Sequence, residues 1–424
     1  MRTKWAAALG VGAGLVGVAV VAAWPAERPD IVLVVLDTVR AESTSLCGYG
    51  RPTTPVLERL QAEGWSTSCQ MVTPGTWTTP SHASFFTGKS VVELQSGAVE
   101  PDPADTLVGR LDARGYHSVL LSANMVLAQP EWFSAGFDQV RIASSFSDYT
   151  GPALADALGE LLGGAPDDAP LFLVVNIIDA HAPYPGIPRT VGWVPGQRPV
   201  QHRMWVADPN TPFNRYVSGA MSAEDAEAFT GRLRNGYDWG VHQADANLGR
   251  VLTALEAVDR LEGARVVVTS DHGEFVGEHG QVGHGDTLFE PGVRVPLLVR
   301  DPSGPVRLPS PFPGQQVFDL VLDGAVSHAG PPVSVTHFRD SARESWDGLA
   351  IWPSTTDKLV WRPDAWQRFD LAADPGELAP RALEEHAMRP HLESLVDRHK
   401  EALEARTEPD DDTMELLRAA GYIE

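Results

Sequence analysis

The feature that most constrains the fold is a set of strand-like sequences that each run directly into polar, potentially reactive residues. Ile31–Leu36 is an uninterrupted apolar and largely β-branched run, which is typical of a parallel strand buried on both faces of a sheet. Residues 171–178 form a second buried strand of this kind, and residues 265–270 form a third strand. Strand and helix patterns alternate up to about residue 320. We therefore expect an α/β fold with a mostly parallel sheet flanked by helices.

The pattern changes in the C-terminal part of the chain. Short strands separated by turns are expected, as in an antiparallel meander, at residues 349–352, 358–361 and 366–371. A helix over about residues 380–405 and a short final helix over residues 414–420 should follow. The chain is thus predicted to divide into a catalytic domain over residues 28–325 and a small C-terminal subdomain over residues 326–424.

Residues 76–89 predict a helix that begins near Thr78 and is stopped by Gly88. Pro80 suits the first turn, because its missing N–H is no loss there. Thr78 and Thr79 then lie at the helix entrance, where free backbone N–H groups favour an anion. A hydroxyl held there can attack an ester of phosphate or sulfate. The alternative is that either threonine only caps the helix.

Two of these strands are followed directly by a carboxylate residue. Asp37 follows the first strand, and Asp271, with His272 next to it, follows the third. This is the edge at which α/β sheets place their ligands, although Asp37 could instead cap a helix. Two carboxylates and an imidazole are good ligands for a divalent cation, and the histidine indicates zinc or manganese rather than calcium. Such a cation would activate the Thr78 hydroxyl as a nucleophile.

Two further histidines are candidates for the same site. His181 follows the second strand, and His284 lies twelve residues after His272 in a Gly-rich loop that can fold back onto the site. A single histidine is more often structural or exposed than catalytic. His181 and His284 are therefore candidates only because the other candidate residues are expected at the same site. The segment from Pro185 to about Met221 is rich in Pro, Gly and Trp, and we interpret it as a long surface insertion that could wall a substrate cleft.

Charge and cysteine content exclude some functions. The formal net charge is −23, with 33 Lys and Arg against 56 Asp and Glu, so a nucleic-acid partner is not expected. Cys47 and Cys69 are the only cysteines, and they match no zinc pattern. A disulfide between them stays open, but we expect two small buried thiols.

The N-terminus predicts export. Arg2 and Lys4 precede an uncharged run over residues 5–24 that is rich in Ala, Gly and Val. This run fits a cleavable signal peptide, and it is also long enough to anchor the chain in a membrane. Residues 1–26 are therefore expected to be a signal peptide or an N-terminal membrane anchor, and either one places the body of the protein in the periplasm or outside the cell.

Short motifs along the chain, in this order, together resemble the sulfatase branch of the alkaline phosphatase superfamily. The markers are PDIVLVVLDTVR at 29–40, GYG at 48–50, TTP at 53–55, TPSHAS at 79–84, HAPY at 181–184, SDHGE at 270–274, GHG at 283–285, VPL at 295–297, FDL at 369–371, DPGE at 374–377, and Leu416-Leu417 to Gly421-Tyr422. Each motif is weak by itself, whereas their common order is specific. The resemblance extends over residues 29–424 and implies an alkaline-phosphatase-like fold.

The resemblance also implies roles for individual residues. It implies metal ligands at Asp37, Thr78, Asp271 and His272. Thr78 matches the nucleophile of the family, which also touches the metal. His181 and His284 match residues that hold the ester oxygens or protonate the leaving group.

Several positions depart from the family pattern. Type I sulfatases carry a cysteine or serine at the Thr78 position, within Cys-x-Pro-Ser-Arg, and convert it to formylglycine. Thr78 does not allow that maturation, and His82 stands in place of the arginine. Thr38 follows Asp37 where many sulfatases have paired aspartates, and the His284 position is often lysine in members that cleave sulfate. A threonine nucleophile resembles instead the phosphodiesterases and the envelope transferases that move phosphoethanolamine or glycerol phosphate.

We therefore expect an exported, metal-dependent hydrolase that cleaves a phosphate ester or diester, or a sulfate ester, through a covalent Thr78 intermediate. Its substrate would be a small-molecule, glycan or lipid ester. One alternative is an envelope transferase that passes the Thr78-bound group to a lipid or glycan hydroxyl, although such transferases usually have several membrane spans. The other is a catalytically silent, membrane-tethered binding protein. The sequence leaves the oligomeric state open.

Overall fold

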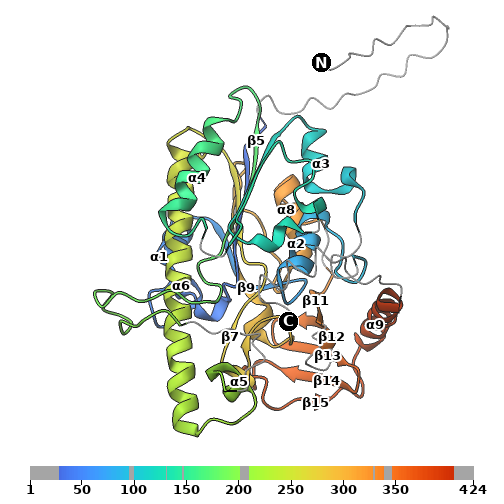
Figure 1. Ribbon diagram of the computed structural model, residues 1–424. Coiled ribbons are helices and arrows are strands. Elements are labelled where there is room, and N and C mark those ends of the chain that lie inside the picture. Colours follow the sequence, from blue (N-terminus) through green and yellow to red (C-terminus); the bar gives the residue numbers. More distant parts are fainter. Residues whose placement is uncertain are drawn as a thin grey trace, which may run out of the picture.

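The computed structural model describes residues 28–94, 100–129, 131–145, 148–200, 210–327, 330–338 and 346–404. An eight-stranded sheet forms the centre of the molecule, with helices on both faces (Figure 1). In spatial order its strands are β10 (Phe312–Pro313), β2 (Ser66–Val72), β9 (Arg294–Arg300), β6 (Arg265–Thr269), β1 (Ile31–Leu36), β5 (Leu171–Ile177), β3 (His117–Ser122) and β4 (Gln139–Ile142). Strands β6 to β4 are parallel, and only β9 runs antiparallel to its neighbours. The predicted α/β fold is confirmed.

Helices cover both faces of this sheet, as Figure 1 shows. In chain order, the helices of the described residues are α1 (Pro55–Ala62), α2 (Thr78–Thr87), α3 (Leu107–Asp112), α4 (Pro152–Gly163), α5 (Pro212–Val217), α6 (Ala223–Glu256), α7 (Glu290–Val293), α8 (Val317–Asp323) and α9 (Arg389–Glu404). Helices α1, α4 and α6 cover one face of the central sheet and α2, α3 and α8 the other, whereas α9 packs against the second, C-terminal sheet. Side chains alternate along β1, so that Val32 and Val34 join the core under α1, α4 and α6. Leu33 and Val35 join the opposite core, under α2, α3 and α8. This two-sided burial explains why β1 has no polar residue.

A second, antiparallel sheet lies beside the first, as the meander pattern predicted. Its strands, in order, are β11 (Val333–Phe338), β12 (Trp346–Ser354), β13 (Asp357–Arg362), β14 (Ala365–Asp370) and β15 (Arg381–Ala382). The predicted helix over 380–405 begins later, at Arg389, because Arg381–Ala382 pairs with β14. The predicted boundary between residues 325 and 326 falls between α8 and β11, and it stays a prediction.

Some predicted segments lie outside the described residues, namely the N-terminal residues 1–26 and the final helix over 414–420. Within the described ranges, the structure contains no helix of the length and apolarity that a membrane crossing requires. The predicted insertion after Tyr184 carries α5 and two isolated bridges, which pair Tyr184 with Val200 and Ile187 with Gln197. A short hairpin of β7 (Phe275–Val276) and β8 (Val282–Gly283) forms the Gly-rich loop.

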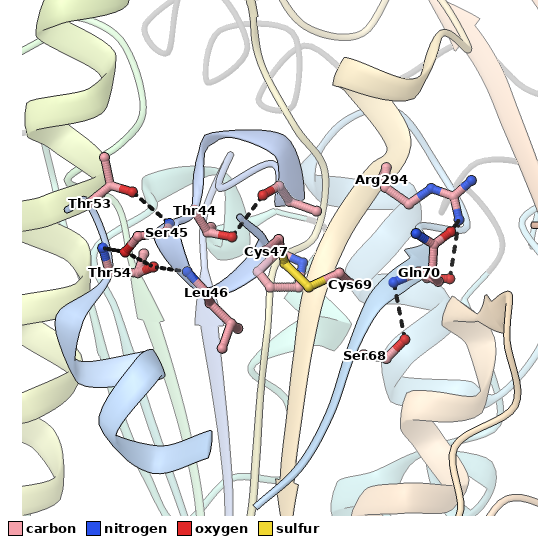
Figure 2. The surroundings of a disulfide bond; sticks show 12 residues. Thr44, Ser45, Leu46, Cys47, Thr53, Thr54, Ser68, Cys69, Gln70 and Arg294 are labelled. Carbon is pink, nitrogen blue, oxygen red and sulfur yellow. Dashed lines mark hydrogen bonds between the residues drawn. A yellow bond between two sulfur atoms is a disulfide. The ribbon is translucent and has the colours of Figure 1, made fainter. Parts of the chain in front are cut away.

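The expectation of two free thiols is wrong, since Cys47 and Cys69 form a disulfide with Cα atoms 5.8 Å apart. Figure 2 shows that this bond joins the 3₁₀ turn Ser45–Cys47 to strand β2. The turn is held on its other side by Thr54, whose hydroxyl accepts from the Leu46 N–H at 3.1 Å. Both cysteines are only partly buried. The disulfide therefore fixes the loop after β1 to a strand that is not adjacent to β1 in the sheet.

The α1 helix begins at Pro55, after Thr54, but the Thr54 hydroxyl does not cap it. Instead the carboxylate of Asp245, from the middle of α6, accepts hydrogen bonds from the N–H groups of Val56 at 2.8 Å and Leu57 at 3.0 Å. Asp245 is 1% exposed, and burial raises the pKa of its carboxyl group to about 7, although the two N–H donors oppose that rise.

This pKa makes stability depend on pH. In the unfolded chain Asp245 loses its proton near its ordinary pKa of 3.8, whereas in the folded protein it keeps the proton until about pH 7. The folded state therefore binds more protons between these values, so the Asp245 contribution to the free energy of unfolding falls as pH rises from about 4 to about 7. Asp245→Asn should remove this part of the decline.

Chemical denaturation at several pH values tests this expectation. Relative to wild type, Asp245→Asn should gain stability steadily from pH 4 to pH 7. Asp156→Asn on the exposed face of α4 is the control for loss of one carboxylate. A stability difference between Asp245→Asn and wild type that does not vary over this range would contradict the assignment.

Candidate active site

The candidate site lies at the carboxyl edge of the central sheet. Strands β1 and β6 are parallel neighbours, so the residues that follow them, Asp37, Asp271 and His272, come together. His272 Nε2 lies 3.9 Å from Asp37 Oδ1 and 3.5 Å from Asp271 Oδ2. One ligand atom from each residue lies within 4.8 Å of the others, and all three side chains are fully buried.

In each of the two carboxylates, one oxygen accepts hydrogen bonds, and we call it the outer oxygen. Asp37 Oδ2 accepts from Asn124 Nδ2 at 2.7 Å and from Asn176 Nδ2 at 3.2 Å. Asp271 Oδ1 accepts from its neighbour's backbone N–H at 3.0 Å and, more weakly, from Thr38 N at 3.4 Å. The inner oxygens, Asp37 Oδ1 and Asp271 Oδ2, have no hydrogen-bond partner within the part of the chain that the structure describes. Two buried carboxylate oxygens of like charge thus face each other.

The imidazole of His272 completes this group as a neutral ligand. Its Nδ1–H donates to the Gly273 carbonyl at 3.0 Å, which leaves Nε2 with the lone pair that points at the two carboxylates. Burial, assisted by the neighbouring His284, lowers the pKa of His272 to about 3, so the ring is neutral at physiological pH. The unpartnered oxygens and this nitrogen fit a divalent cation.

Thr78 lies next to this group, as the first residue of α2. Its Oγ1 is 3.4 Å from His272 Nε2 and accepts from Asn124 Nδ2 at 3.1 Å. The N-cap position belongs to the extended residue Trp77, so Thr78 is inside the helix and does not occupy the capping position. Gly88 ends the helix in a left-handed conformation, with φ of 68°.

Asn124 is the residue that sequence reasoning missed. Its amide bridges Thr78 and Asp37, and its own Oδ1 is fixed by the Val126 N–H at 2.9 Å. The available signal was its place just beyond strand β3, at the same carboxyl edge as Asp37. Asn124 lies two residues after the last residue of β3, so it does not follow the strand directly as Asp37 and Asp271 do.

His284 and His181 follow outward from the centre. The His284 ring lies 4.3 Å from the His272 ring and 5.0 Å from the His181 ring, measured between centroids. The buried Glu274 carboxylate contacts His284 Nδ1 at 2.7 Å and accepts from the Tyr184 hydroxyl at 2.9 Å. Burial raises the pKa of Tyr184 well above its usual value, so this hydroxyl keeps the proton that it donates. The Gly-rich loop therefore folds back onto the site, as predicted.

His82 lies one helical turn after Thr78. Its Nδ1–H donates to the Thr78 carbonyl at 3.0 Å and lies 3.6 Å from Asp271 Oδ2. The ring is fully buried. His82 therefore contacts both the backbone of the helix start and one of the facing carboxylates.

A pair of hydroxyls connects the second sheet to this site. Thr336 of β11 and Thr76, two residues before Thr78, both donate to the Gly285 carbonyl, at 2.6 Å and 2.9 Å. The two hydroxyl oxygens are 3.2 Å apart. Gly285 follows His284 directly, so these contacts fix the histidine loop against the start of helix α2.

Comparison with known proteins gives a consistent result. The model of the family described as Sulfatase matches residues 29–317. The chain is 30% identical to arylsulfatase K of Gallus gallus over 187 residues, which is 36% of this chain and 34% of that protein. It is 24% identical to the ulvan-active sulfatase of Formosa agariphila over 306 residues, or 65% and 56% of the two chains. The matched regions thus cover between about a third and somewhat over half of these relatives.

A solved structure shares the fold. The phosphonate monoester hydrolase of Agrobacterium radiobacter superposes with a TM-score of 0.62 at 17% identity, over 91% of this chain and 99% of that one. At this identity the match supports the architecture of the central sheet, its helices and the C-terminal sheet.

Zinc or manganese should raise the unfolding midpoint of the wild-type protein, because a ligand that binds only the folded state stabilises it. At a metal concentration 100 times the Kd, the gain is about 2.7 kcal/mol. Asp271→Ala should lose both this shift and the bound metal, as measured by calorimetry and elemental analysis. Asp238→Asn removes a fully buried carboxylate outside the group and should keep the shift. Unchanged metal content in Asp271→Ala would refute the ligand assignment.

Thr336→Val should lower kcat by about fivefold with little change in KM, since losing one hydrogen bond of about 1 kcal/mol loosens the histidine loop. Thr336→Ser should restore kcat, because the donor returns. Ser334→Ala on the same strand is the control, as its buried hydroxyl has no hydrogen-bond partner among the described residues. Steady-state kinetics of the three variants decide the matter, and an unaffected kcat in Thr336→Val would exclude a positioning role.

Proposed function

This chain belongs to the sulfatase family, and from that premise we propose that it hydrolyses a phosphate ester or diester, or a sulfate ester, with Thr78 as covalent nucleophile. The observation that carries the proposal is the place of Thr78 Oγ1. It lies 3.4 Å from the lone-pair nitrogen of His272 and 3.1 Å from the Asn124 amide, beside two facing carboxylates. A capping hydroxyl would need none of these neighbours.

Asp37, Asp271, His272 and Thr78 would hold the divalent cation. When bound, the cation supplies positive charge that activates a hydroxyl and offsets the charge of the ester oxygens. A nitrogen ligand suits zinc or manganese better than calcium, which prefers oxygen ligands. Among the described residues, no lysine or arginine forms an ion pair with either carboxylate, and one oxygen of each has no hydrogen-bond partner, which supports a need for such an ion.

The side chains of the site divide the work. The Asn124 amide orients the Thr78 oxygen for attack on phosphorus or sulfur, and the bond to the leaving oxygen breaks as the new ester bond forms. His284, oriented by Glu274, and His181 beyond it are placed to hold the ester oxygens or to protonate the leaving oxygen. Water then hydrolyses the Thr78 ester and frees the hydroxyl.

Threonine at this position sets the protein apart from formylglycine-dependent members of the family. A threonine cannot be matured to formylglycine, so the hydroxyl itself must act. Its β-branched side chain has few χ1 rotamers, which favours one fixed orientation toward the cation ligands. His82, in the place of the arginine of the maturation motif, contacts the Thr78 carbonyl.

The site of action is outside the cytoplasm. Residues 1–26 have the pattern of a signal peptide or anchor. The Cys47–Cys69 disulfide supports export, because disulfides persist mainly in oxidising compartments. Cell fractionation that finds the protein in the cytoplasm, with its N-terminus intact, would refute this part of the proposal.

Thr78→Ala should lower turnover by several orders of magnitude, because the covalent step is lost. The fold and the metal content should change little, because Asp37, Asp271 and His272 remain as ligands. Thr78→Ser should keep part of the activity, since the hydroxyl remains. Thr79→Ala, the neighbouring hydroxyl, is the matched control and should cost far less. Hydrolysis of 4-nitrophenyl phosphate, methyl 4-nitrophenyl phosphate and 4-nitrophenyl sulfate provides the rates.

Intact-mass analysis of the quenched reaction locates the covalent group. A phosphoryl or sulfuryl adduct should map to the peptide that contains Thr78. An adduct on another residue, or full activity in Thr78→Ala, would overturn the mechanism.

A further inference from the structure

A cavity of about 760 Å³ lies directly beside the catalytic centre, and the proposed function does not yet explain it. His181 lines its inner end, and the adjoining rings of His284 and His272 lead from there to the metal-ligand group. Its walls come from the segment before α4, the loop after β5, the start of the insertion and the middle of α6. Its place beside His181 is that of a leaving group.

The walls of this cavity carry almost no charge. Asp179 and His181 are the only ionisable residues that line it, and no lysine or arginine does so within the described part of the chain. Asp179 is held by the Asn247 amide at 2.6 Å. The Arg250 guanidinium, which donates to Asn247 Oδ1, acts on Asp179 from outside the cavity lining. A leaving group with a second sulfate, phosphate or carboxylate would therefore meet Asp179 at a wall whose described residues include no lysine or arginine.

The uncharged walls have the composition of a ring-binding site. Trp239 and Gln243 lie one turn apart on α6 and therefore on the same face of the helix. Behind Trp239, the His242 ring stacks at 5.3 Å and 25°. Pro185 and Pro188 of the insertion add apolar surface. The side-chain amide of Gln243 makes no hydrogen bond with the residues that the structure describes, so it can serve a ligand hydroxyl.

We propose that this cavity binds the leaving group of the substrate and selects an uncharged, hydroxylated ring, such as a neutral pyranose, over a ring with a second anionic group. The proposal rests on the proposed function of the adjoining site. Trp239 supplies the surface for the apolar face of the ring, and Gln243 supplies donor and acceptor groups for its hydroxyls.

The test begins with the choice of the ester type. The three reporters are 4-nitrophenyl phosphate, methyl 4-nitrophenyl phosphate and 4-nitrophenyl sulfate, and the type chosen is the one that wild type hydrolyses and Thr78→Ala does not. The same ester is then placed on C6 of glucose, with and without a second such group on C1. Wild-type kcat/KM should favour the singly substituted sugar by about tenfold or more, as expected for an unpaired anion beside a carboxylate. Trp239→Ala should lower kcat/KM for this sugar by about five- to tenfold.

Gln243→Lys provides a gain-of-function arm. It should reduce or reverse the preference by improving turnover of the doubly substituted sugar. Thr253→Lys adds the same charge at an exposed position of α6 and should leave the preference unchanged.

The outcomes separate the two proposals. If no 4-nitrophenyl ester is hydrolysed in a Thr78-dependent manner, the proposed function fails, and this inference fails with it. If the reporter activity depends on Thr78 but wild type turns over the doubly substituted sugar equally well or better, or Trp239→Ala has no effect, only the assignment of the cavity is overturned.

Discussion

Two buried carboxylates that face each other, Asp37 and Asp271, are the constraint on which the rest of the structure depends. Each has its outer oxygen satisfied by N–H donors, and each keeps its inner oxygen unpaired in the described structure. Like charges in a buried setting destabilise the fold unless a cation compensates them. The sheet nevertheless places them together, because they follow adjacent parallel strands that are covered on both faces. The fold thus carries an electrostatic cost at the edge where it places Thr78.

The second sheet belongs to this arrangement, because it positions loops that reach the site. Thr336 binds the carbonyl next to His284. On the middle strand of this sheet, β13, the fully buried Lys358 contacts Glu377 at 2.6 Å and Glu290 at 3.3 Å. Glu290 begins α7, which leads into strand β9 of the first sheet. A buried ion pair of this kind gives little net stability but fixes one geometry, so the C-terminal sheet holds both the histidine loop and the end of the central sheet.

The structure is best predicted from the sequence where a run of residues is compatible with only one environment. The uninterrupted apolar run of β1 requires burial on both faces, which predicts a central parallel strand. Because the strand before Asp271 belongs to the same sheet, the sequence predicts that Asp37 and Asp271 lie at one edge. The role of Asn124 could not be predicted, because an asparagine after a strand has many local roles. Only the spatial order β1-β5-β3 brings its amide to Thr78. The disulfide could not be predicted for a similar reason, since the spacing of Cys47 and Cys69 does not show which strand the loop after β1 contacts. Asp245 caps a helix that lies far from it in the chain, and no local pattern marks such a contact.

The acidity of the whole chain and the chemistry of the site act over different distances. A net charge of −23 disfavours the approach of strongly anionic molecules, but salt screens this effect beyond about 8 Å at physiological ionic strength. Inside the buried centre, a cation between Asp37 and Asp271 would act on the ester group at contact distance with little screening. The described residues that line the cavity beside His181 include no lysine or arginine. If that cavity binds the leaving group, as proposed, its binding energy comes mainly from shape, apolar surface and hydrogen bonds, and the attraction of an anion is confined to the ester group at the buried centre.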